Sequence, residues 1–279
     1  MLLLSQNHIS IDQILAKYPN QKLNIDRLDL AKLETLDFFE ITYLSNSKKI
    51  KGFVALPKNT KIKLPIIIYN RGGSKEFAKI DSEQLTGYIA SLALGGFIVV
   101  ASQYSGNGGS EGKDERGGVE LEDVLVLREV ASEVEHADTE NVFMVGVSRG
   151  GMMAYLANTR VGWIKKTAIL CGEVDIQDSI DRRPEYAEYI SDMYDTKSED
   201  ENRKRSIIYN INQLKQNANF MIFQGSLDKQ LHPQRVLDFT NLLYASKIPF
   251  SFHFLDGQDH YFGTSRIFVI NRIIRWFGE

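Results

Sequence analysis

A serine between two glycines, at a predicted strand-to-helix turn, is the first candidate for chemistry. The sequence VFMVGVSRGG contains Gly146, Ser148 and Gly150 in a G-x-S-x-G pattern. The apolar run 142–146 predicts a buried strand, and residues 152–157 predict a helix. A sharp turn in this context exposes the serine as a nucleophile, and side chains at the two glycines would collide with the neighbouring strand or helix. The alternative is a glycine-rich turn with an incidental serine.

A serine hydroxyl needs a base within hydrogen-bond reach and an acid that orients the base. The predicted strand 219–224 is followed by Asp228, and the predicted strand 250–255 is followed by His260. Both residues therefore lie just past the carboxyl end of a strand, in the chain order serine, acid, histidine. We predict Ser148 as the nucleophile, His260 as the base and Asp228 as the orienting acid.

Other residues near these two loops leave alternatives open. Asp228 could instead cap a turn, and Asp259 is an alternative acid, although a direct sequence neighbour of His260 points elsewhere on an extended loop. Of the five histidines, only His260 follows the final predicted strand on a loop. His232 is expected to border the pocket at most.

The negative charge that develops on the substrate needs two backbone N–H donors. The residue after the nucleophile, Arg149, provides one. The loop after the early strand 64–69 provides the other, from Gly73 or, with a shift of one residue, from Gly72. The alternative for this loop is a plain Gly-Gly turn.

Four motifs in this order give the chain a resemblance to a known family. The segments NRGGS, GVSRGG, GSLDKQLHP and GQDHYF resemble the catalytic domain of the prolyl oligopeptidase family and, more broadly, α/β-hydrolases. The similarity extends from about residue 38 to residue 277. It implies a serine peptidase or esterase. The loop that begins at Tyr104 also resembles a glycine-rich loop of that family, and we place Tyr104 among the substrate-binding residues.

The chain departs from the family pattern in three places. Arg71 stands where the family usually has His or Tyr before Gly-Gly, and Ser105 replaces an Arg of the family. We expect no β-propeller before this domain, because only about 37 residues precede the first predicted strand. Peptidase activity is therefore implied less firmly than serine hydrolysis.

The order of predicted elements indicates an α/β fold. Strands alternate with helices, which predicts an α/β-hydrolase fold with a mostly parallel central sheet and helices on both faces. The helix over residues 81–94 is expected to begin at an Asp81 N-cap, with Gln84 placed for a capping box. We divide the chain into an N-terminal helical extension, residues 1–37, with spaced Ile and Leu up to Leu33, and a hydrolase domain, residues 38–279.

The polar stretch 173–217 lies between two core strands, where we expect a lid or cap insertion. Its Tyr186 and Tyr189 are predicted to bind substrate and to form an apolar wall with Met193 and Tyr194. The charge run 197–205 is expected to be a solvated face. The alternative is a surface excursion that never reaches the site.

Composition restricts the partners. The chain has 279 residues, 43% of them hydrophobic, and a net charge of −3, so no basic field indicates nucleic acid. The single cysteine, Cys171, excludes an internal disulfide framework and a thiolate zinc cluster. The sequence has no run of 18 apolar residues and no basic, apolar signal segment at its start, so we expect a cytoplasmic protein without membrane contact. No metal and no cofactor are expected.

These observations predict a serine hydrolase of small esters or of short peptide or amide substrates, acting through an acyl-enzyme. An Arg71 side chain pointing into the pocket entrance would favour a substrate with a carboxylate or a polar acyl end. The alternatives are a non-catalytic ligand-binding protein or an acyltransferase on the same fold. The sequence does not determine the acyl group, the leaving group or the oligomeric state.

Overall fold

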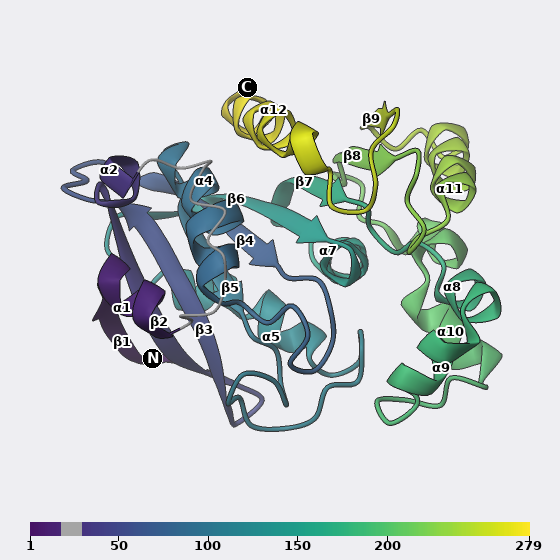
Figure 1. The fold of residues 1–279 in the computed structure, drawn as a ribbon, viewed down its shortest axis with the longest axis horizontal. Coiled ribbons are helices and arrows are strands. Elements are labelled where there is room, and N and C mark those ends of the chain that lie inside the picture. The colour runs from purple at the N-terminus through teal and green to yellow at the C-terminus, as the bar shows by residue number, and fades with distance from the viewer. Residues whose placement is uncertain (18–29) are drawn as a thin grey trace.

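A nine-stranded sheet forms the centre of the protein (Figure 1). The structure, a computed structural model, describes residues 1–17 and 30–279. The strand order is β1-β2-β3-β5-β4-β6-β7-β8-β9. The six strands β4 to β9 run parallel to one another. The pairs β1–β2, β2–β3 and β3–β5 are antiparallel. The strands are β1 (Leu3–Ile9), β2 (Leu36–Ser45), β3 (Lys48–Pro57), β4 (Leu64–Asn70), β5 (Ile98–Ser102), β6 (Ala137–Val147), β7 (Ile164–Leu170), β8 (Phe220–Gly225) and β9 (Phe250–Leu255). This is the predicted α/β-hydrolase architecture.

Helices cover both faces of the sheet. In β4, Ile66 and Ile68 pack into one core and Ile67 and Tyr69 into the other, as the two-residue period of a strand requires. The first core is closed by α5 (Leu121–Leu125), α6 (Leu127–Ala131), α7 (Arg149–Arg160) and α11 (Pro233–Ala245). The second is closed by α1 (Ile11–Lys17), α2 (Leu30–Leu33), the π-helix η2 (Leu85–Ile89), α4 (Ala90–Leu94) and α12 (Arg266–Gly278), and the short helix α3 (Ser82–Gln84) directly precedes η2. None of the described helices combines the length and the apolar character needed to cross a bilayer.

The predicted helix start at Asp81 is confirmed, but the predicted capping box and the single regular helix are not found. The Asp81 carboxylate accepts a hydrogen bond from the Gln84 backbone N–H at 3.1 Å, as an N-cap should. The Gln84 side chain does not complete a capping box, since its amide donates to the Ala78 carbonyl at 2.7 Å. Residues 81–94 form three consecutive helical segments instead of one regular helix.

The N-terminal segment differs from the predicted helical extension. Residues 3–9 form β1, an antiparallel edge strand on β2, and among the described residues before β2 the helical ones are 11–17 and 30–33. Ile14 and Leu33 are buried in the second core. The part of the expected helical region at 18–29 lies outside the described residues. The start of the chain is therefore integrated into the sheet rather than set apart from it.

The stretch 173–217 forms a helical insertion at the end of the molecule opposite β1 and β2 (Figure 1). Its elements are α8 (Ile176–Arg182), α9 (Pro184–Ile190), α10 (Glu199–Arg205), η3 (Ile207–Tyr209) and η4 (Ile211–Gln213). Ile176, Ile190, Met193 and Tyr194 form a small core of its own. The insertion is thus a packed unit.

Candidate active site

Ser148 lies at a strained turn between β6 and α7. Its φ is +55° and its ψ −120°, a backbone conformation that few residues other than glycine adopt. A methyl group on Gly146 would overlap the Gly150 carbonyl, and one on Gly150 would overlap the Asn70 carbonyl of β4. The expected reason for both glycines is confirmed: the turn leaves no room for a side chain two residues before or two residues after the serine.

The structure brings His260 and Asp228 together from two different loops. The His260 Nδ1 atom lies 2.8 Å from the Asp228 Oδ2 atom, and both side chains are buried. Asp228 Oδ1 accepts hydrogen bonds from the backbone N–H groups of Gln230 and Leu231, at 2.8 and 2.9 Å. Asp259, the alternative acid, is exposed and accepts from the Tyr261 N–H. Asp228 is therefore the carboxylate that orients this imidazole.

The charge of Asp228 is stabilised although it is buried. Burial alone would raise the pKa of this carboxyl group. The hydrogen bond from His260, the charge of that imidazole when protonated, and the two backbone N–H groups outweigh burial and lower the pKa below its usual value. The acid thus remains an anion that can hold the Nδ1–H of the histidine.

Ser148 and His260 line the same cavity, which has a volume of about 720 Å³. Gly72 and Gly73 line it as well, and a Cβ atom on Gly72 would lie 3.3 Å from the Ser148 Cβ atom. Within the described residues, no acceptor takes a hydrogen bond from the backbone N–H of Gly72, Gly73 or Arg149. Gly72, Gly73 and Arg149 line the cavity together with Ser148, so these three unpaired amide groups are candidate donors to a developing oxyanion.

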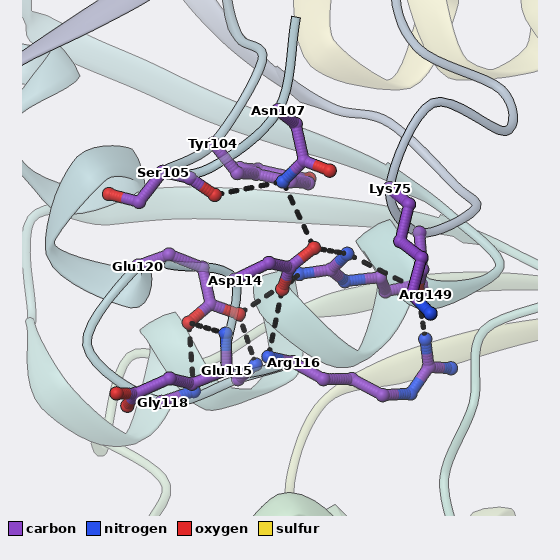
Figure 2. Close-up of polar contacts among 12 residues, drawn as sticks. Lys75, Tyr104, Ser105, Asn107, Asp114, Glu115, Arg116, Gly118, Glu120 and Arg149 are labelled. Carbon is purple, nitrogen blue, oxygen red and sulfur yellow. Dashed lines mark hydrogen bonds and ion pairs between the residues drawn. The ribbon is translucent and has the colours of Figure 1, made fainter. Parts of the chain in front are cut away.

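A buried ionic cluster supports the nucleophile turn (Figure 2). The Arg149 guanidinium bonds both carboxylate oxygens of Asp114, at 2.7 and 2.5 Å, and one of Glu120 at 2.9 Å. Nearby, Arg116 pairs with Glu173 at 2.7 Å and donates to the Ser74 hydroxyl at 2.6 Å. The cluster joins the loop 105–118, the nucleophile helix and the start of the insertion.

The two carboxyl groups beside Arg149 differ in acidity. Burial is the largest influence on each and acts to raise the pKa of both. For Asp114 the two-pronged pairing with Arg149 dominates, and the pKa of this carboxyl lies well below its usual range. The pKa of Glu120, which is fully buried and close to the Asp114 charge, is raised. Pairing with Arg149 thus keeps Asp114 ionised.

Two of the expected substrate-binding residues do not line the cavity. Arg71 is fully buried, and its guanidinium donates to the backbone carbonyls of Gln103 and Gly72, among others. Burial, followed by repulsion from Arg149, lowers the pKa of Arg71 to about 10, so it is still a cation near neutral pH. Tyr104 is also fully buried, packs its ring against the guanidinium groups of both Arg71 and Arg149, and donates to the Arg71 carbonyl at 3.1 Å. Both residues have a structural role. Their side chains donate hydrogen bonds to buried loop carbonyls that have no partner in the sheet.

The insertion does reach the cavity. Tyr186 and Tyr189 line it, whereas Met193 and Tyr194 belong to the insertion's own core. Of the four residues expected to form an apolar wall, two therefore line the cavity and two do not. The expectation of a fully solvated run at 197–205 is also wrong at its end, since Arg205 is buried and donates to the Glu115 and Arg116 carbonyls.

Sequence reasoning missed several charged residues that line the cavity, among them Arg116, Glu173 and Arg183. Only Glu173 carried a usable signal, because it lies just past the carboxyl end of β7, where sites of parallel sheets gather. Its backbone N–H donates to the Ser148 carbonyl at 3.2 Å. His232, considered near the pocket, lies 3.6 Å from Asp178 and is not part of the cavity wall.

Comparison with known proteins places this geometry in a family. The model of the prolyl oligopeptidase family matches residues 84–279, which include Ser148, Asp228 and His260. The chain belongs to the prolyl oligopeptidase family. It is thus a serine hydrolase in general type, which agrees with the strained turn at Ser148 and the histidine–aspartate pair described above.

Relatives of this hydrolase agree in family and fold. A Bacillus subtilis protein described as "Uncharacterized peptidase YtmA" is 31% identical over 124 residues, which are 44% of this chain and 46% of that protein. Acylaminoacyl peptidase of Pyrococcus horikoshii superposes with a TM-score of 0.74 at 20% identity, covering 92% of this chain and 44% of that one. A putative dienelactone hydrolase of Klebsiella pneumoniae superposes with a TM-score of 0.67 at 17% identity, covering 88% of this chain and 99% of that one. The chain therefore matches less than half the length of the two peptidases, and the structural likenesses show the fold.

Proposed function

We propose that this protein hydrolyses small esters or short peptide-like amides through an acyl-enzyme formed on Ser148. The observation that carries the proposal is that Ser148, at a strained turn, lines the same cavity as His260, which Asp228 holds at 2.8 Å. This arrangement contains a nucleophile, a base and an orienting acid in one enclosed space.

Each residue then has a defined role. His260 removes the Ser148 proton as the oxygen attacks the substrate carbonyl, and it later gives that proton to the leaving group. The N–H groups of Arg149 and of Gly73 or Gly72 bind the oxyanion, and their freedom from protein acceptors supports this role. Water, activated by the same histidine, releases the acyl group.

The size of the cavity supports small substrates. A volume of about 720 Å³ lies within the range of sites for small ligands. Tyr186 and Tyr189 of the insertion form part of its wall, and Tyr189 is anchored by a hydrogen bond of 2.8 Å to the Ser74 carbonyl. We infer that residues 173–217 act as a cap that limits the length of the acyl or leaving group.

The test combines labelling and turnover. Wild-type protein should be labelled by a fluorophosphonate probe and should hydrolyse members of a panel of 4-nitrophenyl esters and aminoacyl nitroanilides. Ser148→Ala should lose the label and at least about 10³-fold in kcat/KM. Ser132→Ala, at an exposed serine after α6, is the matched control and should behave as wild type. Turnover retained in Ser148→Ala, or a label on another residue, would contradict the proposal.

A further inference from the structure

Arg183 differs from the other cations in the wall of the catalytic cavity. Arg116 is paired with Glu173 at 2.7 Å, Lys79 with Glu76, and Arg266 lies 3.9 Å from Glu83. The Arg149 guanidinium is bound by two buried carboxylates. Among the described residues, no carboxylate pairs with Arg183 and no acceptor takes a hydrogen bond from its guanidinium.

The position of this guanidinium is nevertheless fixed. It lies over the Tyr186 ring, 4.3 Å from the ring centroid. The Tyr186 hydroxyl is held in turn by Arg116, which pairs with Glu173. Through the Glu173 backbone N–H, this chain of contacts ends at the Ser148 carbonyl. Arg183 therefore rests on a frame tied to the nucleophile turn.

The contact with the Tyr186 ring leaves the N–H groups of the Arg183 guanidinium available to a ligand. A guanidinium that lies on an aromatic ring uses its flat face, and its five N–H donors remain in the plane around it. Those donors match the two oxygens of a carboxylate in a bidentate pair. Arg183 is about half-buried at the cavity, where water screens such a pair less than on the open surface.

We propose that Arg183 binds an anionic group of the substrate, so that the enzyme prefers esters or amides with a carboxylate. The proposal rests on the hydrolase function given above and assigns its substrate class. It replaces the expectation that Arg71 supplies this charge. The acidic residues Glu76, Asp81 and Glu83 come from the segment 76–84, on a different element from the insertion. Glu173, at the start of the insertion, is paired with Arg116. We therefore place the substrate carboxylate on the insertion side.

The first experiment measures binding in the Ser148→Ala protein, which separates recognition from turnover. The ligands are 4-nitrophenyl hydrogen glutarate, with a carboxylate on the acyl side, and its neutral methyl ester. A second pair, 3-carboxyphenyl butyrate and its methyl ester, carries the charge on the leaving-group side. Isothermal titration should show tighter binding of the acid than of its methyl ester in at least one pair. Arg183→Gln should reduce that preference about 10- to 100-fold, the range for a charge-assisted bidentate contact.

The matched control is Arg182→Gln, which removes the same charge from the exposed neighbouring position at the end of α8. It should leave the preference within about twofold of the parent, because an exposed charge is screened by solvent. Arg183→Lys, which keeps the charge but loses the planar fork, should retain only part of the preference. An equal preference in the parent and Arg183→Gln in both ligand pairs, or an equal loss in Arg182→Gln, would overturn the proposal.

The second measurement, in protein with Ser148 intact, is the ratio of kcat/KM values for the acid and its methyl ester. Loss of this ratio in Arg183→Gln with turnover of both esters supports the specificity role. A wild-type enzyme that hydrolyses both esters at equal rates, with no effect of Arg183→Gln on binding, refutes the role of Arg183 and leaves the hydrolase function standing. Absence of turnover and of fluorophosphonate labelling refutes the hydrolase function, while the binding preference still decides the role of Arg183.

Discussion

Replacing Asp228 with Asn tests how the acid controls the base. Asp228 Oδ2 accepts from His260 Nδ1 at 2.8 Å and from Gln224 Nε2 at 3.1 Å, while Oδ1 accepts from two backbone N–H groups. An asparagine must keep its oxygen toward the backbone donors, which turns its NH₂ group toward His260 and Gln224. The imidazole then has to accept at Nδ1, so its proton moves to Nε2. A histidine in this tautomer cannot take the serine proton.

The structure also indicates that this variant folds. The Gln224 Oε1 atom is buried and has no hydrogen-bond partner, so rotation of that amide can offer an oxygen to the new NH₂ group. The rotation gives up the bond that Nε2 donates to the Gly225 carbonyl at 3.2 Å, but that carbonyl still accepts from the backbone N–H of residue 228 at 3.3 Å. We expect a change in the free energy of unfolding below about 2 kcal/mol, within the range of a single hydrogen bond to a charged group. The loss of kcat/KM should be about 10⁴-fold, or about 5 kcal/mol of transition-state stabilisation.

The assay is kcat/KM on the best 4-nitrophenyl ester, with urea denaturation to check folding and ¹⁵N NMR of the His260 ring to read its tautomer. Asp259→Asn is the control, because this neighbouring carboxylate is exposed and accepts a hydrogen bond from the Tyr261 N–H and not from His260. It should stay within about threefold of wild type, as an exposed substitution changes free energies by less than about 0.5 kcal/mol. A folded Asp228→Asn enzyme that loses less than tenfold, or a larger loss in Asp259→Asn, would refute the reasoning.

Three further predictions concern stability. Arg149→Met leaves two buried carboxylates without their cation and should lower the free energy of unfolding by about 3–5 kcal/mol, measured by urea denaturation; a loss below 1 kcal/mol would contradict the cluster's role. Gly150→Ala should destabilise by at least about 1–3 kcal/mol because its methyl group meets backbone, whereas Gly87→Ala, with open space around it, should be neutral or stabilising; equal effects of the two would be inconsistent with the close packing at the turn. The pKa of Asp228 is lowered in the folded state, so its contribution to stability is present above the ordinary carboxyl pKa of about 3.9 and is lost as pH falls below it. Melting temperatures recorded from pH 6 to pH 3 should therefore fall more steeply for wild type than for Asp228→Asn, and parallel curves would contradict this.

The sequence predicted the parts of the site that local rules determine. The glycines around Ser148 follow from sterics at one turn, and the loops carrying Asp228 and His260 follow from the ends of two apolar strands. Parallel strands bring their carboxyl ends to the same edge of the sheet, so the three residues could be expected near one another without knowing any contact.

The N-terminal strand could not be found in the same way. Residues 3–9 of β1 lie at the sheet edge, and most of them are exposed. An edge strand with one solvated face needs no long apolar run, and polar residues interrupt this one. Pairing with β2, a distant segment of the chain, determines its conformation, and periodicity within residues 3–9 does not report that pairing.

The two arginines considered for substrate charge show where sequence reasoning ends. Arg71 follows a core strand beside two glycines and was expected to face the pocket, yet the unpaired carbonyls of Gln103 and Gly72 draw its guanidinium into the protein. Arg183 lies in a polar insertion that carries no motif, yet Tyr186, three residues later on α9, turns its side chain toward the cavity. A strand end determines where a residue's backbone lies, but the direction of a long side chain depends on which acceptors and rings lie within about 6 Å of its tip. Some of these neighbours are local, but others are distant in sequence: Arg71 reaches the Gln103 carbonyl, and the Tyr186 hydroxyl is held by Arg116. The placement of charge in this site therefore had to be read from the structure.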